Sequence, residues 1–399
     1  MKKLMILGGS RYILPVIEAA HNLGCYVITC DYLPDNFAHR YSDKYCNISI
    51  IDKEAVLLTA NELQIDGIMS FACDPGVTTA AYVAEKMCLP SVGSYESVQI
   101  MQNKGRFRRF LKENGFNVPM AKSYSNVNEA IQDIDMFQWP VIVKPTDSAG
   151  SKGVTRVDDA SKLRESIFHA LSFSHNNEFI IEDYLQQVGF SSDADSFSVD
   201  GILKYISFDC QWFDRKAHNP YTPAAYSWPS SISMKHQSEL KREIQRLISL
   251  LGLRTSIYNI ETRECIDGNA YIMECSPRGG GNRLAEMARH TAGVDLIQAS
   301  VNAALGESII DIEQKEQNGY WAEIILHSSK QGIFKELWIS DEAEPYIVER
   351  DLWITAGMPV GGFSGANEAI GTLVFNFDSE EKMGNILSNQ DKFIQVRIL

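Results

Sequence analysis

The first ninety residues alternate short β-rich runs with helical patterns, and this rhythm limits the fold more than any other feature of the sequence. Strands that alternate with helices form parallel sheets, because each crossover helix brings the chain back to the end of the sheet where the previous strand began. A parallel-sheet domain is therefore expected at the N-terminus. The predicted strands are residues 4–7, 26–30 and 67–70, and the predicted helices are residues 15–23, 53–63 and 78–86.

The turn after the first strand is a possible anion site. Gly8, Gly9 and Ser10 follow that strand and open a helix, where backbone N–H groups can face a ligand. The dinucleotide fingerprint G-x-G-x-x-G is not met, because Ser10 and Ile13 stand where glycines are needed. We therefore predict a tight strand-to-helix turn in a supporting Rossmann-like domain, with a nicotinamide site as the alternative.

Chain length and net charge limit the number of domains and the kinds of partner that the protein can have. A chain of 399 residues is too long for one ordinary core, so two or three domains are expected. The net charge of −14 disfavours a nucleic-acid partner, because binding to the phosphate backbone relies on clustered Lys and Arg. No run approaches the ~20 apolar residues that span a bilayer, and the N-terminal apolar run is short for a signal peptide. A cytoplasmic location without a membrane partner is expected.

A second domain is predicted from residue 94 to residue 306, with a central subdomain at about 120–190. It opens with one amphipathic basic helix that Gly115 and Pro119 close. Residues 209–233 hold three prolines and no clear period, so we expect a long loop, and such loops are usually functional. The other predicted elements are strands at 140–144, 179–182, 195–199, 203–212, 256–262 and 270–274, and helices at 160–171 and 235–251.

A third section, residues 307–399, contains few residues that indicate a chemical function. Its predicted elements are strands at 321–326 and 371–377, a Gly-rich turn at 361–363 and a closing helix at 379–387. The whole chain is therefore expected to combine α/β and α+β architecture, with a small α+β section at the C-terminus.

The segment VIVKPTDSAGSKGV, residues 141–154, carries the strongest local signal for chemistry. A buried strand delivers Lys144, and a loop with two glycines, two serines and Lys152 follows at once. Such a loop can close over a polyphosphate and offer N–H donors, while Lys144 supplies charge from a rigid element. The Walker A pattern is absent, so this is not a P-loop protein. A surface hairpin is the alternative.

The segment YNIETRECIDGNAYIMECSPRGGGN, residues 258–282, carries the second signal. Asp267 and Gly268 predict a hairpin turn that makes neighbours of the strands holding Glu261 and Glu274. Carboxylates on buried strands are costly unless a cation compensates them, and Mg²⁺ joins carboxylates to phosphates in kinase-like sites. Arg278 adds a forked donor for phosphate or carboxylate. An exposed hairpin with a salt bridge to Arg278 is the alternative.

The order of these signals resembles the ATP-grasp superfamily, particularly its carbamoyl-phosphate-synthase-like and L-amino-acid-ligase-like branches. The resemblance covers nearly the whole chain. It implies an ATP-grasp fold, in which two α+β subdomains clamp ATP, between a preceding Rossmann-like domain and a closing C-terminal domain. The matching positions are Lys104 in QNKGRFRRFL, Lys144 in VIVKP, Glu182 to Leu185 in FIIEDYL, Glu261 in YNIET, and Glu274 to Arg278 in IMECSPR.

The resemblance implies ATP and Mg²⁺ or Mn²⁺ as cofactors. Lys104 and Lys144 would contact the α- and β-phosphates, and Glu182 would lie near the adenine amino group. The loop that folds over the triphosphate would use Ser148, Gly150, Ser151, Lys152 and Gly153, and the adenine would be read by Asp183, Tyr184 and Leu185.

The same resemblance implies that Glu261 and Glu274 hold the metal and that Arg278 stabilises the transferring phosphoryl group. This sequence departs from the family at two places. Ser276 stands where the family usually has Asn, so Ser276 or Asn282 would complete the metal site. The ribose-binding Glu expected after the hinge is missing, and Asp193 or Asp195 would replace it.

The implied reaction is ADP-forming ligation of a small, amino-acid-like carboxylate to an amine through an acyl phosphate. The alternatives are an ATP-dependent carboxylase, a carbamate or carboxyl kinase, and a degenerate ATP-binding regulatory protein. A homodimer is expected from resemblance alone. Side chains that would select the substrate, or merely pack, are Trp212, Arg215, His218, Tyr226, Trp228 and Arg283.

Overall fold

The computed structural model describes all 399 residues, and its N-terminal part is the expected parallel sheet. The strand order is β3-β2-β1-β4, and every neighbouring pair is parallel. Strand β1 is almost wholly buried because helices cover both faces of the sheet. Strand β3 was not predicted, since its residues KYCN lack an apolar period. The elements are β1 (Lys3–Leu7), β2 (Tyr26–Asp31), β3 (Lys44–Asn47), β4 (Gly67–Ser70), α1 (Leu14–Asn22), α2 (Lys53–Leu63) and α3 (Asp74–Met87).

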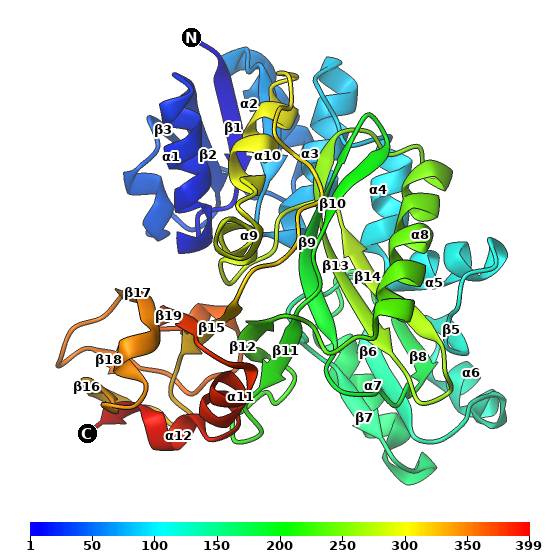
Figure 1. The fold of residues 1–399 in the computed structure, drawn as a ribbon. Coiled ribbons are helices and arrows are strands. Elements are labelled where there is room, and N and C mark those ends of the chain that lie inside the picture. The colour runs from blue at the N-terminus through cyan, green and yellow to red at the C-terminus, as the bar shows by residue number, and fades with distance from the viewer.

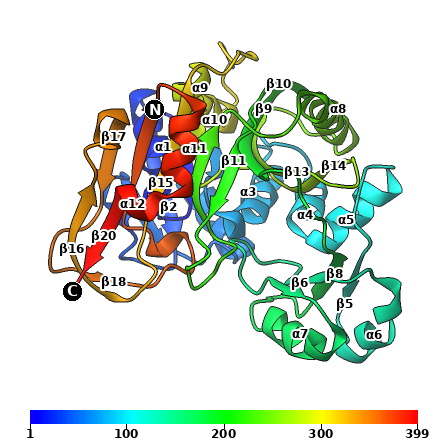
Figure 2. The same cartoon turned by 60° about the horizontal axis from the view of Figure 1, so that its bottom comes forward.

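Two antiparallel sheets form the middle of the molecule, and we call them the central sheet and the small sheet. The central sheet has the order β10-β9-β13-β14, and the small sheet has the order β5-β8-β6-β7. The small sheet projects from the body at the lower right of Figure 2. Their strands are β9 (Ser192–Val199), β10 (Ile202–Ile206), β13 (Ser256–Glu264), β14 (Ala270–Ser276), β5 (Ala121–Tyr124), β6 (Val141–Pro145), β7 (Thr155–Val157) and β8 (Phe179–Asp183).

The predicted basic helix after residue 94 is in fact two helices, so that prediction was wrong in its extent. Helix α4 (Tyr95–Gln102) ends at Asn103, which has extended backbone angles, and α5 (Lys104–Glu113) begins directly after it. The Asn103 side chain accepts a hydrogen bond from the Arg106 amide at 2.9 Å. Asparagine is a strong N-cap, so it starts a new helix instead of extending the old one.

Residues 209–233 are not the long loop that the sequence predicted. They form a β-hairpin of β11 (Cys210–Phe213) and β12 (Pro223–Trp228), and β12 pairs with β15 (Tyr320–Leu326). The strand expected at 203–212 is also divided, because β10 belongs to the central sheet and β11 belongs to this third sheet. The pairing partner of β12 lies about 100 residues further along the chain. A local sequence pattern does not indicate a pairing strand that lies so far along the chain.

The C-terminal section adds the rest of that third sheet, whose order is β11-β12-β15-β19-β17, and a three-stranded sheet β18-β16-β20. In Figure 1 it lies below the N-terminal sheet, coloured orange to red. The expected strands β15 and β19 and the closing helix α11 are present. The added elements are β16 (Gly332–Ile339), β17 (Ile347–Leu352), β18 (Pro359–Val360), β19 (Gly371–Phe377), β20 (Ile394–Ile398), α11 (Glu380–Ser388) and α12 (Gln390–Phe393).

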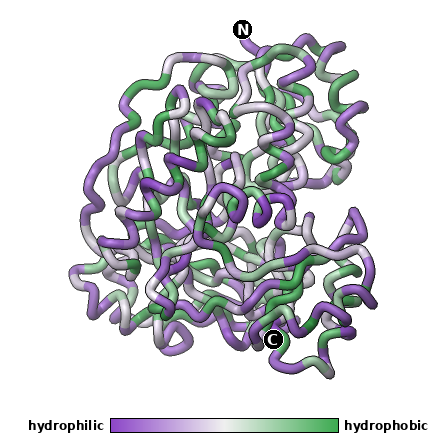
Figure 3. The backbone as a smooth tube through the Cα atoms, turned by 90° about the vertical axis from the view of Figure 1, so that its right-hand side faces the viewer, coloured by the Kyte–Doolittle hydropathy of each residue, from purple (hydrophilic) through white to green (hydrophobic).

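The remaining helices cover the sheets and fix how they meet. Helices α9 (Leu284–Ala292) and α10 (Leu296–Ala304) share one hydrophobic core with α1 and β1 of the first sheet. Helix α8 (Met234–Leu250) buries its apolar face on the central sheet, and α7 (Leu163–Leu171) and α6 (Val127–Gln132) cover the small sheet. Figure 3 shows hydrophobic and hydrophilic colour alternating along most of the chain. None of the helices has the length and apolar character needed to cross a membrane.

Candidate functional site

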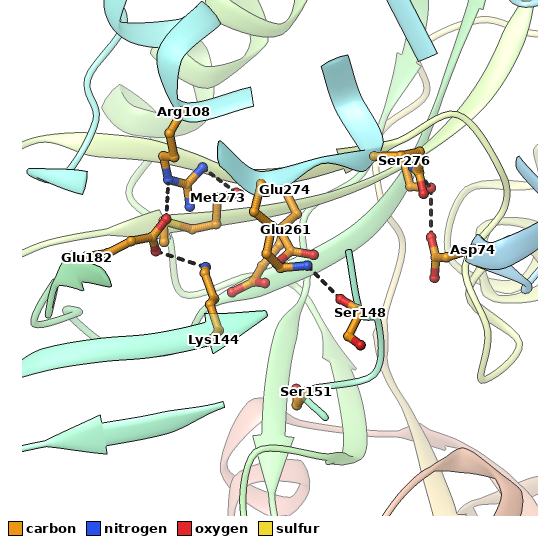
Figure 4. A network of polar contacts seen from close by, with 12 residues as sticks. Asp74, Arg108, Lys144, Ser148, Ser151, Glu182, Glu261, Met273, Glu274 and Ser276 are labelled. Atoms are coloured by element: carbon orange, nitrogen blue, oxygen red, sulfur yellow. Dashed lines mark hydrogen bonds and ion pairs between the residues drawn. The ribbon is translucent and has the colours of Figure 1, made fainter. Parts of the chain in front are cut away.

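Two glutamates lie opposite each other on neighbouring strands of the central sheet. Glu261 on β13 and Glu274 on β14 are cross-strand partners, and their side chains lie close together in Figure 4. Burial by itself would raise the pKa of Glu274, but the ammonium groups of Lys104 and Lys144 outweigh burial and lower it. Glu274 therefore stays ionised at neutral pH. The pair presents negative charge on one face of the sheet.

Two lysines from different elements converge on this face. Lys104 is the first residue of α5, and its Nζ lies 3.2 Å from an oxygen of Glu274. The same ammonium donates a hydrogen bond of 2.8 Å to the Ser148 carbonyl, which ties α5 to the Gly/Ser loop. Lys144 on β6 is buried, and burial lowers its pKa against the opposing charge of Glu182. Arg263 also binds Glu261, with its Nη2 at 2.7 Å from one carboxylate oxygen, so three cations lie beside the two carboxylates.

A buried ion triad holds Lys144 in place. Glu182 on β8 receives Lys144 Nζ at 2.9 Å on one oxygen and Arg108 Nε at 2.8 Å on the other. Arg108 also donates to the Met273 carbonyl at 2.7 Å, so the triad joins α5, the small sheet and β14 (Figure 4). Burial would raise the pKa of Glu182, but Arg108 and Lys144 hold it at about 2. A charge that is buried this deeply is stable only with such partners.

The Gly/Ser loop after β6 has a backbone that favours glycine. Gly150, Ser151 and Gly153 have φ angles of 66°, 57° and 71°, in the left-handed region. A Cβ on Gly153 would also come within 3.0 Å of the Phe173 ring. The loop is held against the turn of the β11–β12 hairpin, because the Ser151 hydroxyl donates to the Tyr221 carbonyl at 3.0 Å. This contact places the loop between the small sheet and the hairpin.

Arg278 follows β14 and joins the central sheet to the first sheet. Its Nε and Nη2 donate to the two oxygens of Asp74, at 2.9 and 2.7 Å, and Asp74 is the first residue of α3. Its Nη1 donates to Asn259 at 2.9 Å and to the Gly279 carbonyl at 3.1 Å. Four of the five guanidinium N–H donors therefore have partners, which leaves one for a ligand.

Three aspartates lie along β9 and just beyond β10, of which Asp195 and Asp209 are buried and Asp193 is half-buried. Asp193 is the cross-strand neighbour of Glu261, and burial raises its pKa well above the ordinary value. Asp195 accepts a hydrogen bond from the Gly280 amide at 2.9 Å, and burial raises its pKa to about 7. Burial also raises the pKa of Asp209 to about 7. This side of the site therefore has more acidic groups than bases to neutralise them.

Comparison with known proteins identifies this arrangement. The family model for the ATP-grasp domain matches residues 137–286, which include both glutamates, Lys144 and the Gly/Ser loop. The chain carries an ATP-grasp domain. The predicted resemblance and fold class are thereby confirmed.

Relatives found by sequence are carbamoyl phosphate synthase large chains. That of Clostridium beijerinckii is 20% identical over 74% of this chain, and that of Thermotoga neapolitana is 22% identical over 65%. The chain matches only 27% and 23% of the lengths of these two relatives. The chain is therefore similar to about a quarter of the length of each of these enzymes.

Solved structures resemble this chain over its full length. An L-amino acid ligase from Bacillus licheniformis is 19% identical with a TM-score of 0.81, covering 100% of this chain and 99% of its own. A phosphoribosylglycinamide synthetase from Anaerococcus prevotii is 20% identical with a TM-score of 0.77, covering 100% of both chains. These likenesses establish the fold that surrounds the ATP-grasp domain.

The residues that were expected to read adenine lie at the end of β8, in the hinge between the small sheet and the central sheet. The Asp183 amide donates to the Met120 carbonyl at 2.9 Å. The Tyr184 amide donates to the Pro140 carbonyl at 3.0 Å. The Leu185 amide has no partner, so it is free to donate to a base. Glu182 points away from solvent into the ion triad, which makes it a support for Lys144 as well as a neighbour of the expected adenine site.

A separate cavity of about 620 Å³ borders the same hinge. Its wall includes Asp183 to Leu185, Arg156 and Trp139, but none of the lysines or glutamates described above. The cavity is therefore distinct from the polar cluster of the ATP-grasp domain. Of its lining, the sequence analysis had singled out only Asp183, Tyr184 and Leu185, as the residues expected to read adenine.

The four expected metal ligands do not form one cluster. Glu261 and Glu274 face each other, but the Ser276 hydroxyl donates to Asp74 at 2.9 Å and accepts from Gln102 at 2.8 Å. Asn282 is buried with an unpartnered side-chain oxygen. Nowhere do three or more His, Cys, Asp or Glu side chains gather as a complete metal site. Two facing carboxylates nevertheless fit Mg²⁺, which is usually held by one or two carboxylates and by substrate phosphates.

The residues expected to select a substrate are scattered. Tyr226 is buried, and its hydroxyl donates to Asp193 at 3.4 Å, so it does reach the site. Arg283 is paired with Glu286 and with Glu349 of the C-terminal section. The others lie elsewhere: Trp212 and Trp228 are hydrogen-bonded within their own surroundings, His218 packs on Gly362, and Arg215 is exposed. Lys152, which was expected to cover the triphosphate, is also exposed.

Three residues of the site were missed in the sequence. Asp74 follows strand β4 of the parallel sheet, and the C-terminal ends of parallel strands are common binding edges, so a signal was present. Arg108 lies four residues after Lys104, on the same face of α5, which a helical projection would have shown. Glu323 on β15 is the cross-strand partner of Tyr226, and it gave no signal because this pairing is known only once the third sheet is assembled.

Proposed function

We propose that the chain is an ATP-dependent carboxylate–amine ligase that releases ADP and phosphate. The observation that carries the proposal is the convergence of two lysines, Lys104 and Lys144, with the facing pair Glu261 and Glu274 on an ATP-grasp domain. Cations that hold phosphates beside carboxylates that hold Mg²⁺ are the parts that phosphoryl transfer requires. The L-amino acid ligase with the same overall fold supports the choice of ligation.

In this proposal the chain's own residues bind and orient ATP. Lys104 and Lys144 hold the α- and β-phosphates, and the loop from Ser148 to Gly153 covers the triphosphate with N–H donors. The Leu185 amide donates to the adenine, and Asp193 lies at the ribose end in place of the family's Glu. Bound Mg²⁺ would neutralise the γ-phosphate between Glu261 and Glu274. The remaining Arg278 donor would stabilise the transferring group.

The reaction then has two proposed stages. A substrate carboxylate oxygen attacks the γ-phosphorus in line, and the bond to ADP breaks, which yields an acyl phosphate. An amine attacks the acyl carbon, its proton leaves, and phosphate departs as the leaving group. The buried triad keeps Lys144 fixed through both stages, and fixed charges need no reorganisation as the transferring charge moves.

A product assay tests the proposal. The protein is incubated with Mg-ATP and with pools of amino, hydroxy and sugar acids and amines, while ADP, phosphate and product mass are followed. We expect ADP release that depends on an acid and a condensed product that depends on an amine. Release with bicarbonate alone would replace the ligase by a carboxylase or carboxyl kinase. Tight ATP binding without turnover in any pool would reject both enzymes in favour of a regulatory protein.

The Glu274→Gln variant sharpens this assay. Removing the ionised carboxylate leaves the expected Mg²⁺ with one fewer anionic ligand, so ADP release should fall by at least about a hundredfold. Thermal unfolding should remain close to that of the natural chain, because Gln keeps the size of the side chain. Glu165→Gln, on the exposed surface of α7, is the matched control and should keep full turnover. Equal rates in both variants would refute the metal-binding role of Glu274.

A further inference from the structure

Buried polar atoms without hydrogen-bond partners gather near β15. Both carboxylate oxygens of Glu323 lack a partner, although none of this residue is exposed. One oxygen of Asp209, which is equally buried, also lacks a partner. A buried polar atom without a partner costs about 1–3 kcal/mol, and an isolated charge costs more. Buried polar atoms without a partner in the protein are therefore candidates for hydrogen bonds to a bound ligand.

Tyr226 shows that these carboxylates belong to one site. Tyr226 on β12 and Glu323 on β15 are cross-strand partners, so their side chains leave the sheet on the same face. The Tyr226 hydroxyl donates to Asp193 at 3.4 Å, and the Asp193 amide donates to Asp209 at 2.9 Å. Burial raises the pKa of Tyr226, and the charges of Asp193, Asp209 and Glu323 raise it further. Because Asp193 is also the neighbour of Glu261, this site adjoins the expected phosphate site.

The remaining neighbours leave an excess of acceptors. The Tyr12 hydroxyl, from the turn after β1, and the Asn282 side-chain oxygen are both buried without partners. Arg283 is the cation that acts most strongly on Glu323, but one of its nitrogens already binds Glu286 and Glu349. Its other terminal nitrogen, Nη1, is unpartnered. Glu323, Asp209 and Asn282 together hold four unpartnered side-chain oxygens, whereas the unpartnered donors named here are Nη1 of Arg283, with two N–H groups, and the Tyr12 hydroxyl.

We propose that Glu323 and Asp209 bind an ammonium group carried by a substrate, an assignment that rests on the proposed ligase function. An ammonium offers three N–H donors for the three unpartnered oxygens of Glu323 and Asp209. Burial raises the pKa of both carboxyl groups in the free protein, and the positive charge of a bound ammonium favours their ionised form. A substrate with a neutral group at this position would leave the carboxylates unpaired. The assignment makes Glu323 a specificity residue that the C-terminal section supplies to the ATP-grasp domain.

The ammonium has two possible sources in a ligase. It is either the amino group of an amino-acid substrate whose carboxylate is phosphorylated, or a second amino group on the amine that attacks. Matched pairs of probes separate the two. The first set pairs α-amino acids with their des-amino acids, and the second pairs diamines with monoamines of equal chain length.

Binding is measured by isothermal titration calorimetry with Mg²⁺ and a non-hydrolysable ATP analogue, so that the result does not depend on turnover. In one set we expect the ammonium-bearing probe to bind at least about tenfold more tightly than its partner. Glu323→Gln and Asp209→Asn should each remove most of that preference. Glu336→Gln, an exposed carboxylate on β16 of the same section, should keep it. Whichever set shows the preference identifies the source.

The outcomes separate this proposal from the ligase proposal. Lack of preference in both sets, or a preference that survives in both variants, would overturn the ammonium site even if ADP release and condensation occur. A preference that Glu323→Gln removes, without ADP release from any probe, would uphold the site and reject the ligase. Glu323→Gln should also unfold at a higher temperature than the natural chain, because it removes a buried unpaired carboxylate. A residue with only a structural role would show the opposite shift.

Discussion

At the scale of single residues, the site is defined by which buried charges have partners. Glu182 forms ion pairs through both oxygens, with Arg108 and with Lys144, whereas Glu323 has neither an ion-pair partner nor a hydrogen-bond partner. A paired buried carboxylate becomes a rigid support, because removing one partner leaves the others uncompensated. An unpaired one weakens the free protein until a ligand arrives. The two glutamates should therefore respond in opposite directions when their charge is removed.

Glu182→Gln should destabilise the protein by about 3–5 kcal/mol. The substitution leaves Arg108 and Lys144 buried without an opposing carboxylate, and it also frees Lys144 from its fixed position. Urea denaturation followed by circular dichroism measures the change. The exposed pair Lys162 and Glu165 provides the control, because Glu165→Gln should shift the midpoint hardly at all. A small effect at Glu182 would mean that the triad contributes little to folding.

Asp209→Asn should change how stability depends on pH. Burial raises the pKa of Asp209 to about 7, so the native carboxyl group keeps its proton above the pKa of about 4 that it has when unfolded. The native state then binds the extra proton between those values, and stability falls as pH rises through that window. The natural chain should lose up to about 1.4 kcal/mol per pH unit relative to the variant. Parallel slopes in urea denaturation across the window would contradict the raised pKa.

At the scale of elements, the sequence predicted those whose signals are local. The strands carrying Lys144, Glu261 and Glu274 were predicted because buried strands and an Asp-Gly turn are readable within a few residues. The division between α4 and α5 was missed although Asn103 marks it, since the amphipathic pattern continues across the break. The β11–β12 hairpin was missed for a different reason. Its strands are defined by β15, a distant partner.

The Gly/Ser loop yields a prediction at this scale. Gly150 has a φ angle of 66° with open space where a Cβ would stand, so Gly150→Ala adds backbone strain without a clash. Strain of about 1–2 kcal/mol in the closed loop should raise the KM for ATP by about fivefold to thirtyfold. Gly252→Ala, with a φ angle of 61° and equally open space after α8, is the matched control. Steady-state kinetics with equal KM values in the two variants would show that the loop does not close on ATP.

At the scale of the whole molecule, the three predicted sections are tied together by side chains and by a sheet. Arg278 and Asp74 join the central sheet to the first sheet, while Arg283 and Glu349 join α9 to the C-terminal section. Helices α9 and α10 share a core with the first sheet, a contact between residues nearly 300 apart that no local pattern reveals. The predicted domain boundaries at residues 93 and 306 remain predictions. The boundary at residue 306 can be tested, because the third sheet combines strands from both sides of it.

A chain cut after residue 306 should not fold as a stable unit. The cut removes β15, so β12 loses its neighbour and presents an unpaired, apolar edge. We expect aggregation or rapid proteolysis of the hairpin, measured by size-exclusion chromatography and limited trypsin digestion. Adding residues 307–399 as a separate chain should restore protection if the third sheet can reassemble. A soluble, protease-resistant fragment 1–306 would show that the hairpin folds without its partner.

The shared third sheet also governs what happens while the chain is being synthesised. Strand β12 leaves the ribosome about 100 residues before β15, a delay of about 5–20 seconds at ordinary elongation rates. During that interval the hairpin has no strand to pair with, and neither Tyr226 nor Asp209 can reach Glu323. The ammonium site that we propose is therefore among the last parts of the protein to form. A nascent chain that stalls in this interval already contains the residues proposed to bind ATP. It lacks Glu323, the residue proposed to select the substrate that is phosphorylated or the amine that attacks.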